Sequence, residues 1–430
     1  MLKRIRHSGR ELLSPGAWKT RLVFWMGAVV VGLFATAFAL GSEYANELFL
    51  EGVQQWPYLP FLITPLGLVL VAWLTQRFVP EARGSGIPQA IAALQMTDHN
   101  ARMQLLSLRI AIGKILLCML GMLSGASIGR EGPTVHIGAA VMFSLGRFVK
   151  FPNHYMDHGL ILAGSAAGIA AAFNTPLAGI LFAIEEMGRS FEQRTSGTLL
   201  TAVFIAGITA VAIQGNYSYF GTNTAVLPPA QILIPVFVCG IAGGIAGGLF
   251  STLLIWSTRK LAPHTRQWPL RVALICGLLL AVIGALSGGL SFGTGYHEAR
   301  LIVTGAEELP GSYPFYKMAA TWISYLSGIP GGIFAPSLAA GAGFGASLAD
   351  WLPSYPVGVV VILGMVGYFT GVVQTPITAF VIVMEMTDNS GLVLPLMATA
   401  FIAHVTSRLV CPDPIYRTLA QSFLPAKATS

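Results

Sequence analysis

Charged side chains are scarce in this sequence. Lys, Arg, Asp and Glu together make up 10% of the 430 residues, whereas hydrophobic residues make up 54%. An ordinary soluble domain carries about 25% charged residues, and a chain with so few cannot cover a water-soluble fold with polar side chains. The composition therefore excludes a soluble globular protein and predicts a membrane protein.

Cysteine is also rare, and the four cysteines lie far apart. Cys118, Cys239, Cys276 and Cys411 stand in or beside apolar runs, with no CxxC spacing and no nearby pair of histidines. This pattern excludes a zinc site of the usual ligand spacing and indicates buried, small hydrophobic side chains. We expect no metal site and no cofactor.

Basic residues outnumber acidic ones, and the formal net charge is +7, but the basic residues are not gathered on one amphipathic face. We therefore expect no nucleic-acid partner. Segment 1–21 carries six basic residues against the single acid Glu11, an excess typical of the cytoplasmic side of a membrane. A signal peptide cleaved after Ala37-Phe38-Ala39 is the competing interpretation, but the apolar run is long for one, which favours a retained first span.

Long apolar runs recur along the chain, and each approaches the roughly 20 residues that cross a bilayer as a helix. They occupy residues 22–41, 59–77, 105–125, 157–173, 198–214, 232–256, 269–289 and 390–410. Many of the 49 glycines and 25 prolines fall inside hydrophobic stretches, and interrupted helices in lipid usually line a cavity. The expected fold is an all-α polytopic membrane protein with many tilted and broken helices.

The chain also contains an internal repeat. Asn174-Thr175-Pro176 resembles Gln374-Thr375-Pro376 at an offset of 200 residues, and Glu185 matches Glu385 at the same offset. Broken helices at equivalent positions of two halves point to a transport site between them. The predicted units are an N-terminal segment 1–21, a first membrane repeat 22–214, an inter-repeat loop 215–230, a second membrane repeat 231–410 and a C-terminal segment 411–430.

Three segments place glycine shortly before a proline that begins a helix: 84–88 (GSGIP), 129–133 (GREGP) and 332–336 (GIFAP), the last two at an offset of 203 residues. Proline is favoured at the first helical position, and the glycines let the backbone turn so that free N–H groups face outward. Such a helix start attracts anions. Three of them meeting in an apolar interior would hold a dehydrated anion without a buried cation.

GSGIP, GREGP and GGIFAP, in this order, resemble the three signature motifs of the ClC family of chloride channels and transporters, and the chain is similar in particular to bacterial ClcB-like members. The resemblance implies a transporter rather than an enzyme: two inverted repeats, assembled as a homodimer in the lipid of the bacterial inner membrane, with one chloride pore per subunit. It implies that Ser85 and Tyr416 bind chloride through their hydroxyls, and that Ile333 and Phe334 bind it through backbone N–H groups. An electrical shunt during acid stress is the physiological role that it implies.

The resemblance also gives roles to two acids. Glu131 would be the gate, which competes with chloride when ionised and swings away when protonated; Glu186 would carry the proton on the inner side, which favours proton exchange. Without the resemblance, Glu131 is typical of a helix cap, Glu186 of an interfacial carboxylate and Tyr416 of a membrane-interface anchor. Glu185 and Glu385 stand at equivalent positions and favour a shared structural role such as capping.

Two alternatives stay open at this point. The first is a passive, voltage-gated chloride channel, in which Glu131 gates the pore but no proton is exchanged. The second is an intramembrane serine hydrolase, because Gly125 to Gly129 matches G-x-S-x-G and His404 follows later. Ser127 would then be the nucleophile, although this helical stretch lacks the strand that the pattern requires.

Three further polar residues stand close to the motifs. Lys114 lies in an apolar segment, where a charge is costly, and we expect an ion pair or a long-range attraction for the anion. His136 follows the gate motif and is expected to pack. Gln89 stands where many ClC relatives have glutamate, which predicts a different inner vestibule.

Overall fold

The structure is a computed structural model that describes residues 15–148, 154–188, 193–215, 217–228 and 231–424. The first 14 residues of the predicted cytoplasmic segment and residues 425–430 of the C-terminal segment lie outside this description. Within the described ranges the chain forms helices and no extended strand; two isolated bridges pair Gly84 with Pro330 and Gly129 with Gly332. The all-α prediction is confirmed.

The helices alternate between long spans and short, interrupted pieces. The first half contains α2 (Pro15–Gln55), α3 (Leu59–Phe78), α4 (Ile87–Gln95), α5 (His99–Leu105), α6 (Leu108–Leu123), α7 (Glu131–Leu145), α8 (His154–Phe173), α9 (Pro176–Phe182) and α10 (Gln193–Gln214). The second half contains α11 (Leu233–Gln267), α12 (Pro269–Leu286), α13 (Tyr296–Thr304), α14 (Tyr313–Leu326), α15 (Phe334–Ala349), α16 (Val357–Val373), α17 (Pro376–Thr387), α18 (Val393–Val410) and α19 (Ile415–Ala420). Each predicted apolar run falls on a helix, and six helical segments in the described chain are long and apolar enough to cross a membrane.

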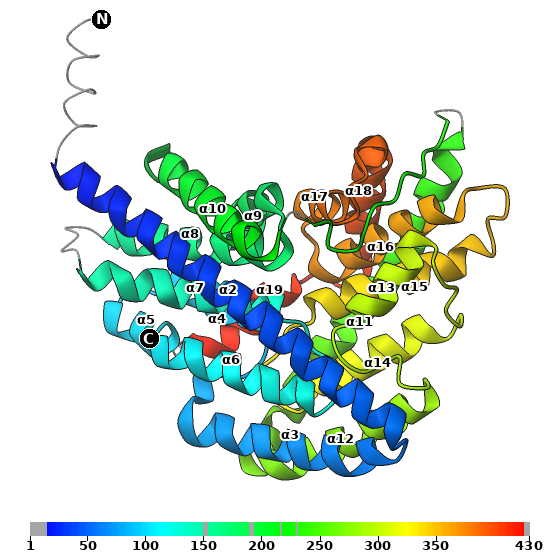
Figure 1. Ribbon diagram of the computed structural model, residues 1–430, viewed down its shortest axis with the longest axis horizontal. Helices are drawn as coiled ribbons and strands as arrows, with labels where there is room; N and C mark the ends of the chain where they lie inside the picture. The colour runs from blue at the N-terminus through cyan, green and yellow to red at the C-terminus, as the bar shows by residue number, and fades with distance from the viewer. Residues whose placement is uncertain (1–14, 149–153, 189–192, 216, 229–230, 425–430) are drawn as a thin grey trace, which may run out of the picture.

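Helix α2 is the longest element. Its 41 residues extend over roughly 60 Å at about 1.5 Å per residue, about twice the hydrocarbon thickness of a bilayer. It crosses the face of the molecule diagonally (Figure 1) and packs against α6, α7, α8 and α10. Phe38 in its middle is completely buried. Ala39 is also buried, whereas Ala37 is exposed.

The two halves lie side by side (Figure 1), with α4–α10 on one side of the molecule, α11 and α13–α18 on the other, and α3 packed on α12 along one edge. Helix α19, from the far end of the chain, lies in the middle of the molecule and packs against α4. The C-terminal segment therefore contacts α4, the helix whose first residues belong to the motif 84–88.

The halves meet through a reciprocal backbone pairing. Gly129 N–H donates to the Gly332 carbonyl at 2.7 Å, and Gly332 N–H donates to the Gly129 carbonyl at 2.8 Å. When each of two residues donates the same hydrogen bond to the other, the two residues are related by a local two-fold axis. This pairing holds the start of α7 beside the start of α15.

A second reciprocal contact joins α9 and α17. The Glu385 carboxylate accepts the N–H of Ala178 at 2.8 Å in the first turn of α9, and the Glu185 carboxylate accepts the N–H of Thr378 at 2.6 Å in the first turn of α17. The shared capping role predicted for the two glutamates is confirmed, and each acid caps a helix of the other half. The first N–H groups of a helix lack partners within the helix, so this exchange stabilises both helix starts.

Candidate anion site between the two halves

Ser85 lies in a tight turn just before α4. Gly84 and Gly86 on either side have φ angles of 66° and 110°, which glycine adopts without the strain that a side chain would bring. The Ser85 residue is 1% exposed, and its hydroxyl has no hydrogen-bond partner among the described residues. An unpaired buried hydroxyl is costly, so this turn presents a donor to a polar ligand.

The side chain of Glu131, the first residue of α7, contacts the second half of the molecule. Its side chain is completely buried, and Oε2 accepts the N–H of Ala335 at 3.3 Å, whereas Oε1 has no hydrogen-bond partner in the part of the chain that the structure describes. Ala335 is the second residue of α15. Because a helix N-terminus favours negative charge, the Glu131 carboxylate occupies a place where a free anion would also be stabilised.

Ile333 and Phe334 form the start of α15, and both are 1% exposed. Backbone N–H groups in a first helical turn point out of the helix end and lack acceptors within the helix. The Phe334 ring packs against Phe173 and Phe369, with ring centroids 5.5 and 4.5 Å apart. This packing fixes the position of the free N–H groups at the start of α15.

Tyr416, on α19, is 1% exposed, and no described residue forms a hydrogen bond with its hydroxyl. It lies within electrostatic range of both Glu131 and Glu186. Since α19 packs against α4, the C-terminal segment brings a second unpaired hydroxyl to the region of Ser85.

The three glycine–proline segments touch one another. A Cβ added to Gly132 would overlap the Ser85 hydroxyl, and a Cβ on Gly332 would lie 3.2 Å from Cδ of Pro133. The predicted convergence of the three helix starts is therefore confirmed. The structure places Ser85, Glu131, Phe334 and Tyr416 in one region between the two halves.

The buried lysine of α6 contacts a histidine instead of an acidic side chain. Lys114 Nζ lies 3.1 Å from Nδ1 of His136, and Nε2 of His136 lies 2.8 Å from the Leu105 carbonyl. The prediction that His136 only packs was wrong, because the ring bridges two elements. Lys317 is the repeat counterpart of Lys114, at an offset of 203 residues, and donates to three carbonyls of Ser291 to Gly293. Sequence reasoning missed Lys317, although the repeat offset identifies it.

Gln89 supports the turn that carries Ser85. Its side chain is completely buried, and Nε2 donates to the carbonyls of Glu81 at 3.0 Å and Arg83 at 2.6 Å. A glutamate could not donate these bonds. The residue at this position therefore anchors the segment that leads into the first motif.

Glu186 lies in a five-residue π-helical turn after α9 and is 3% exposed. Within the described ranges its Oε1 has no hydrogen-bond partner. The side chain borders a cavity of about 180 Å³, which is also lined by Gln95, His158 and Arg417. A buried acid beside a cavity can exchange a proton with water outside the protein.

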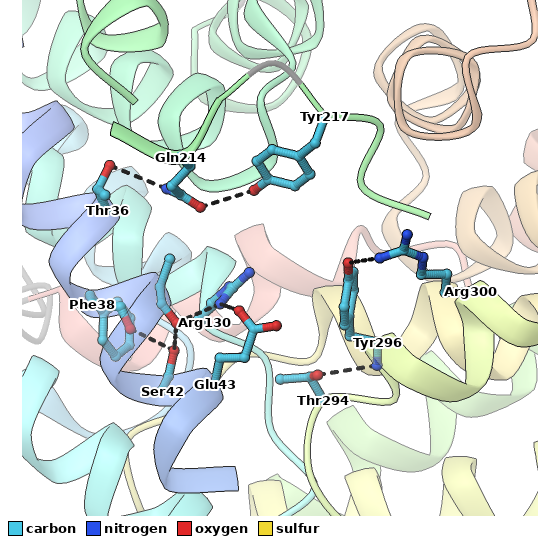
Figure 2. A network of polar contacts seen from close by, with 11 residues as sticks. Thr36, Phe38, Ser42, Glu43, Arg130, Gln214, Tyr217, Thr294, Tyr296 and Arg300 are labelled. Atoms are coloured by element: carbon cyan, nitrogen blue, oxygen red, sulfur yellow. Dashed lines mark hydrogen bonds and ion pairs between the residues drawn. The ribbon is translucent and has the colours of Figure 1, made fainter. Parts of the chain in front are cut away.

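A second cavity, of about 350 Å³, adjoins the gate motif and shares no lining residue with the first. Arg130, next to Glu131 in the sequence, lines this cavity and is only 6% exposed. Its guanidinium donates to the Ala39 carbonyl at 2.7 Å and lies 3.8 Å from the Glu43 carboxylate (Figure 2). Glu186 thus lines one cavity, and Arg130, the sequence neighbour of Glu131, lines the other.

Comparison with known proteins agrees with this geometry. Residues 67–408 match the family described as voltage gated chloride channel. The chain belongs to this ClC family. The H(+)/Cl(-) exchange transporters ClcA of Yersinia pestis and Cronobacter sakazakii are 34% and 32% identical to it, over 96% and 95% of this chain and 91% of each relative.

Solved ClC structures share the fold. The crystal structure of a slow cyanobacterial Cl-/H+ antiporter superposes with a TM-score of 0.82 at 27% identity and covers 97% of this chain and 100% of that one. A CLC-type fluoride/proton antiporter superposes with a TM-score of 0.77 at 24% identity, over 94% and 98% of the two chains, which supports the fold alone. Assignment to the ClcB-like group stays a prediction.

The serine hydrolase alternative is wrong. Ser127 is completely buried in the loop between α6 and α7, and its hydroxyl lies 3.1 Å from that of Thr321. A threonine hydroxyl cannot act as the general base that a nucleophilic serine needs. His404 lies on α18, and the loop follows a helix instead of the required strand.

The contact between the first two ClC motifs can be tested at Gly132. Gly132→Ala should lower the free energy of unfolding by about 1–3 kcal/mol, because the new methyl group overlaps the Ser85 hydroxyl in a packed site. Thermal unfolding in detergent measures the change. The matched control is Gly197→Ala, where nothing lies within 4 Å of the added Cβ. Equal midpoints for both variants would contradict the close approach.

Proposed function

We propose that this ClC protein exchanges chloride for protons across the bacterial inner membrane, with Glu131 as the gate. One observation carries the proposal: the Glu131 carboxylate accepts an N–H at the start of α15, in the region where Ser85 and Tyr416 present unpaired hydroxyls. An ionised carboxylate there competes with chloride for the same donors. A protonated one no longer does, so the proton and the anion are coupled through one side chain.

Chloride in this scheme is held by hydrogen-bond donors. The hydroxyls of Ser85 and Tyr416 and the N–H groups of Ile333 and Phe334 are the proposed ligands. Hydrogen bonds to a charged group contribute about 1.5–3 kcal/mol each, and a helix start adds about half a positive charge. Together these donors replace water around the anion, and all four residues are at most 1% exposed.

Glu186 is the proposed inner proton carrier. It borders its own cavity, and Tyr416 lies within electrostatic range of both Glu186 and Glu131. The basic segment 1–21 favours a cytoplasmic N-terminus, which places the end of α2 and the cavity beside Arg130 on the outer side. Protons then reach Glu131 from outside and Glu186 from inside.

The assembly follows from the same family membership. We propose inverted repeats at 22–214 and 231–410, a loop at 215–230 between them and a segment 411–430 that supplies Tyr416. The proposed homodimer has one pore per subunit, and apolar faces on α10 and α18 are available to a second copy or to lipid. These faces expose Phe204, Ile208, Phe401, Val405 and Leu409.

Two findings favour exchange over a passive channel. The curated relatives at 34% and 32% identity are named as exchange transporters, and the solved structure at 27% identity is a Cl-/H+ antiporter. Glu186 is also a buried acid, and a channel does not need an acid at this position. An electrical shunt that dissipates charge during acid stress remains the proposed physiological role, and no enzymatic activity is proposed.

Reconstituted vesicles test the coupling. A chloride gradient should drive protons uphill through the wild-type protein, and Glu131→Ala should abolish the proton movement while chloride flux continues, because the competing carboxylate is gone. A pH electrode and a chloride electrode record both fluxes. Chloride flux without uphill proton movement in the wild type would identify a channel instead.

The role of Glu186 is separated from that of its neighbour by a matched pair of variants. Glu186→Gln should fold normally and lose proton transport, because the amide cannot carry the proton. Glu185→Gln should retain proton transport and lower the thermal midpoint, because Glu185 caps α17. Unchanged proton flux in Glu186→Gln would remove the assignment.

A further inference from the structure

The cavity beside Glu186 is lined by one acid and one strong base. Among the described residues in its wall, Glu186 is the acid, and Arg417 is the side chain that stays charged at every working pH, because a guanidinium does not lose its proton in proteins. The other lining residues are neutral side chains and one histidine: Ile91, Leu94, Gln95, His158, Met187 and Gly188. Arg417 and Glu186 therefore share a small space of about 180 Å³ that holds few other charges.

Glu186 lies in a poor place for a negative charge. The residue is 3% exposed, and no described residue forms a hydrogen bond with its Oε1. Burial without a full set of hydrogen bonds makes the ionised form of a carboxyl costly. A proton carrier must release its proton as well as take it up. The ionised form of Glu186 therefore needs a positive charge nearby.

Arg417 meets this need from α19. It directly follows Tyr416 on this helix, which lies in the middle of the molecule beside α4 (Figure 1). Arg417 is half-buried, lines the cavity and lies within electrostatic range of Glu186. The ion pairs of the described chain include neither of the two. The guanidinium thus acts across the cavity and does not hold the carboxylate in a salt bridge.

Three other titratable groups stand near Glu186. Glu185, on the same π-helical turn, caps the start of α17. His158 on α8 lines the cavity, and Tyr416 on α19 lies within electrostatic range of the acid. Helices α4 and α9, which also pack against this turn, contain no titratable side chain. All three groups keep their places when only the charge of Arg417 is removed.

We propose that Arg417 is a positioning residue for the inner proton carrier, and that its charge, acting across the cavity, keeps both the protonated and the ionised form of Glu186 accessible. The inference rests on the proposed role of Glu186. When the acid releases its proton, one O–H bond of the carboxyl breaks, a water molecule of the cavity takes the proton, and the guanidinium stabilises the carboxylate that remains. Proton uptake is the reverse of this step. Arg417 keeps its own protons throughout.

Infrared titration of the purified full-length protein tests the proposal. The carboxyl band of Glu186 is the one that Glu186→Gln removes, and its intensity as a function of pH gives the midpoint of protonation. Arg417→Gln should raise this midpoint by about one pH unit, because a nearby opposite charge favours the ionised form by at least that much. Arg417→Lys keeps the charge and should stay near the wild type. An unchanged or lowered midpoint in Arg417→Gln overturns the proposal.

Arg408→Gln is the matched control. It removes the same charge from the last turn of α18, and Arg408 does not line the cavity, so the Glu186 midpoint should not move. An equal shift in Arg408→Gln and Arg417→Gln would show a general effect of lost positive charge and overturn the specific one. Arg417 forms no hydrogen bond within the described ranges, so Arg417→Gln should unfold at the wild-type temperature.

Transport in vesicles gives a second readout. Outward proton movement begins with proton uptake by Glu186 from the inner side, so in Arg417→Gln it should persist to a higher inner pH, by a similar amount. In a Glu186→Gln background, Arg417→Gln should leave chloride flux unchanged; a lower flux there would show that Arg417 acts on the anion and overturn the proposal. The infrared titration does not depend on transport, so a wild type that moves chloride without protons would refute the exchange function separately.

Discussion

The backbone pairing between Gly129 and Gly332 is the contact on which the rest of the site depends. It brings the starts of α7 and α15 so close that Glu131 reaches the Ala335 N–H of the other half. A side chain at position 129 would collide with the Glu131 carboxylate and come within 3.2 Å of that N–H. The glycine is therefore required by close approach, and the proposed anion site made of helix starts depends on it.

The two halves have the same helical framework, and the acids proposed to act in transport stand at positions where the two halves differ. Glu185 and Glu385 cap each other's helices, and Lys114 and Lys317 are buried at matching positions. At the repeat offsets, however, Glu131 corresponds to Phe334, and Glu186 corresponds to a methionine. Duplication thus supplied a symmetric frame with two facing helix starts. In the proposed mechanism, the acid of one half and the N–H groups at the helix start of the other form a single gated site.

Much of this could be predicted from the sequence, because the repeat preserved the spacing between motifs. The apolar runs, the convergence of the glycine–proline segments and the capping role of Glu185 and Glu385 followed from that spacing. The hydrogen bonds of His136 and the position of Arg417 did not. His136 meets Lys114 only through the packing of two helices, and Arg417 lies on a short helix after the second repeat, where no repeat spacing indicates which cavity a side chain lines.

The central claim is that a halide is held deep in the membrane by donors from both halves rather than by a cationic side chain. Crystals grown in bromide test it directly, because bromide has an anomalous signal that locates it without ambiguity. The account predicts a bromide peak in contact with the hydroxyls of Ser85 and Tyr416 and the N–H of Phe334. A bromide bound elsewhere, with these three groups in contact only with protein atoms, would contradict it.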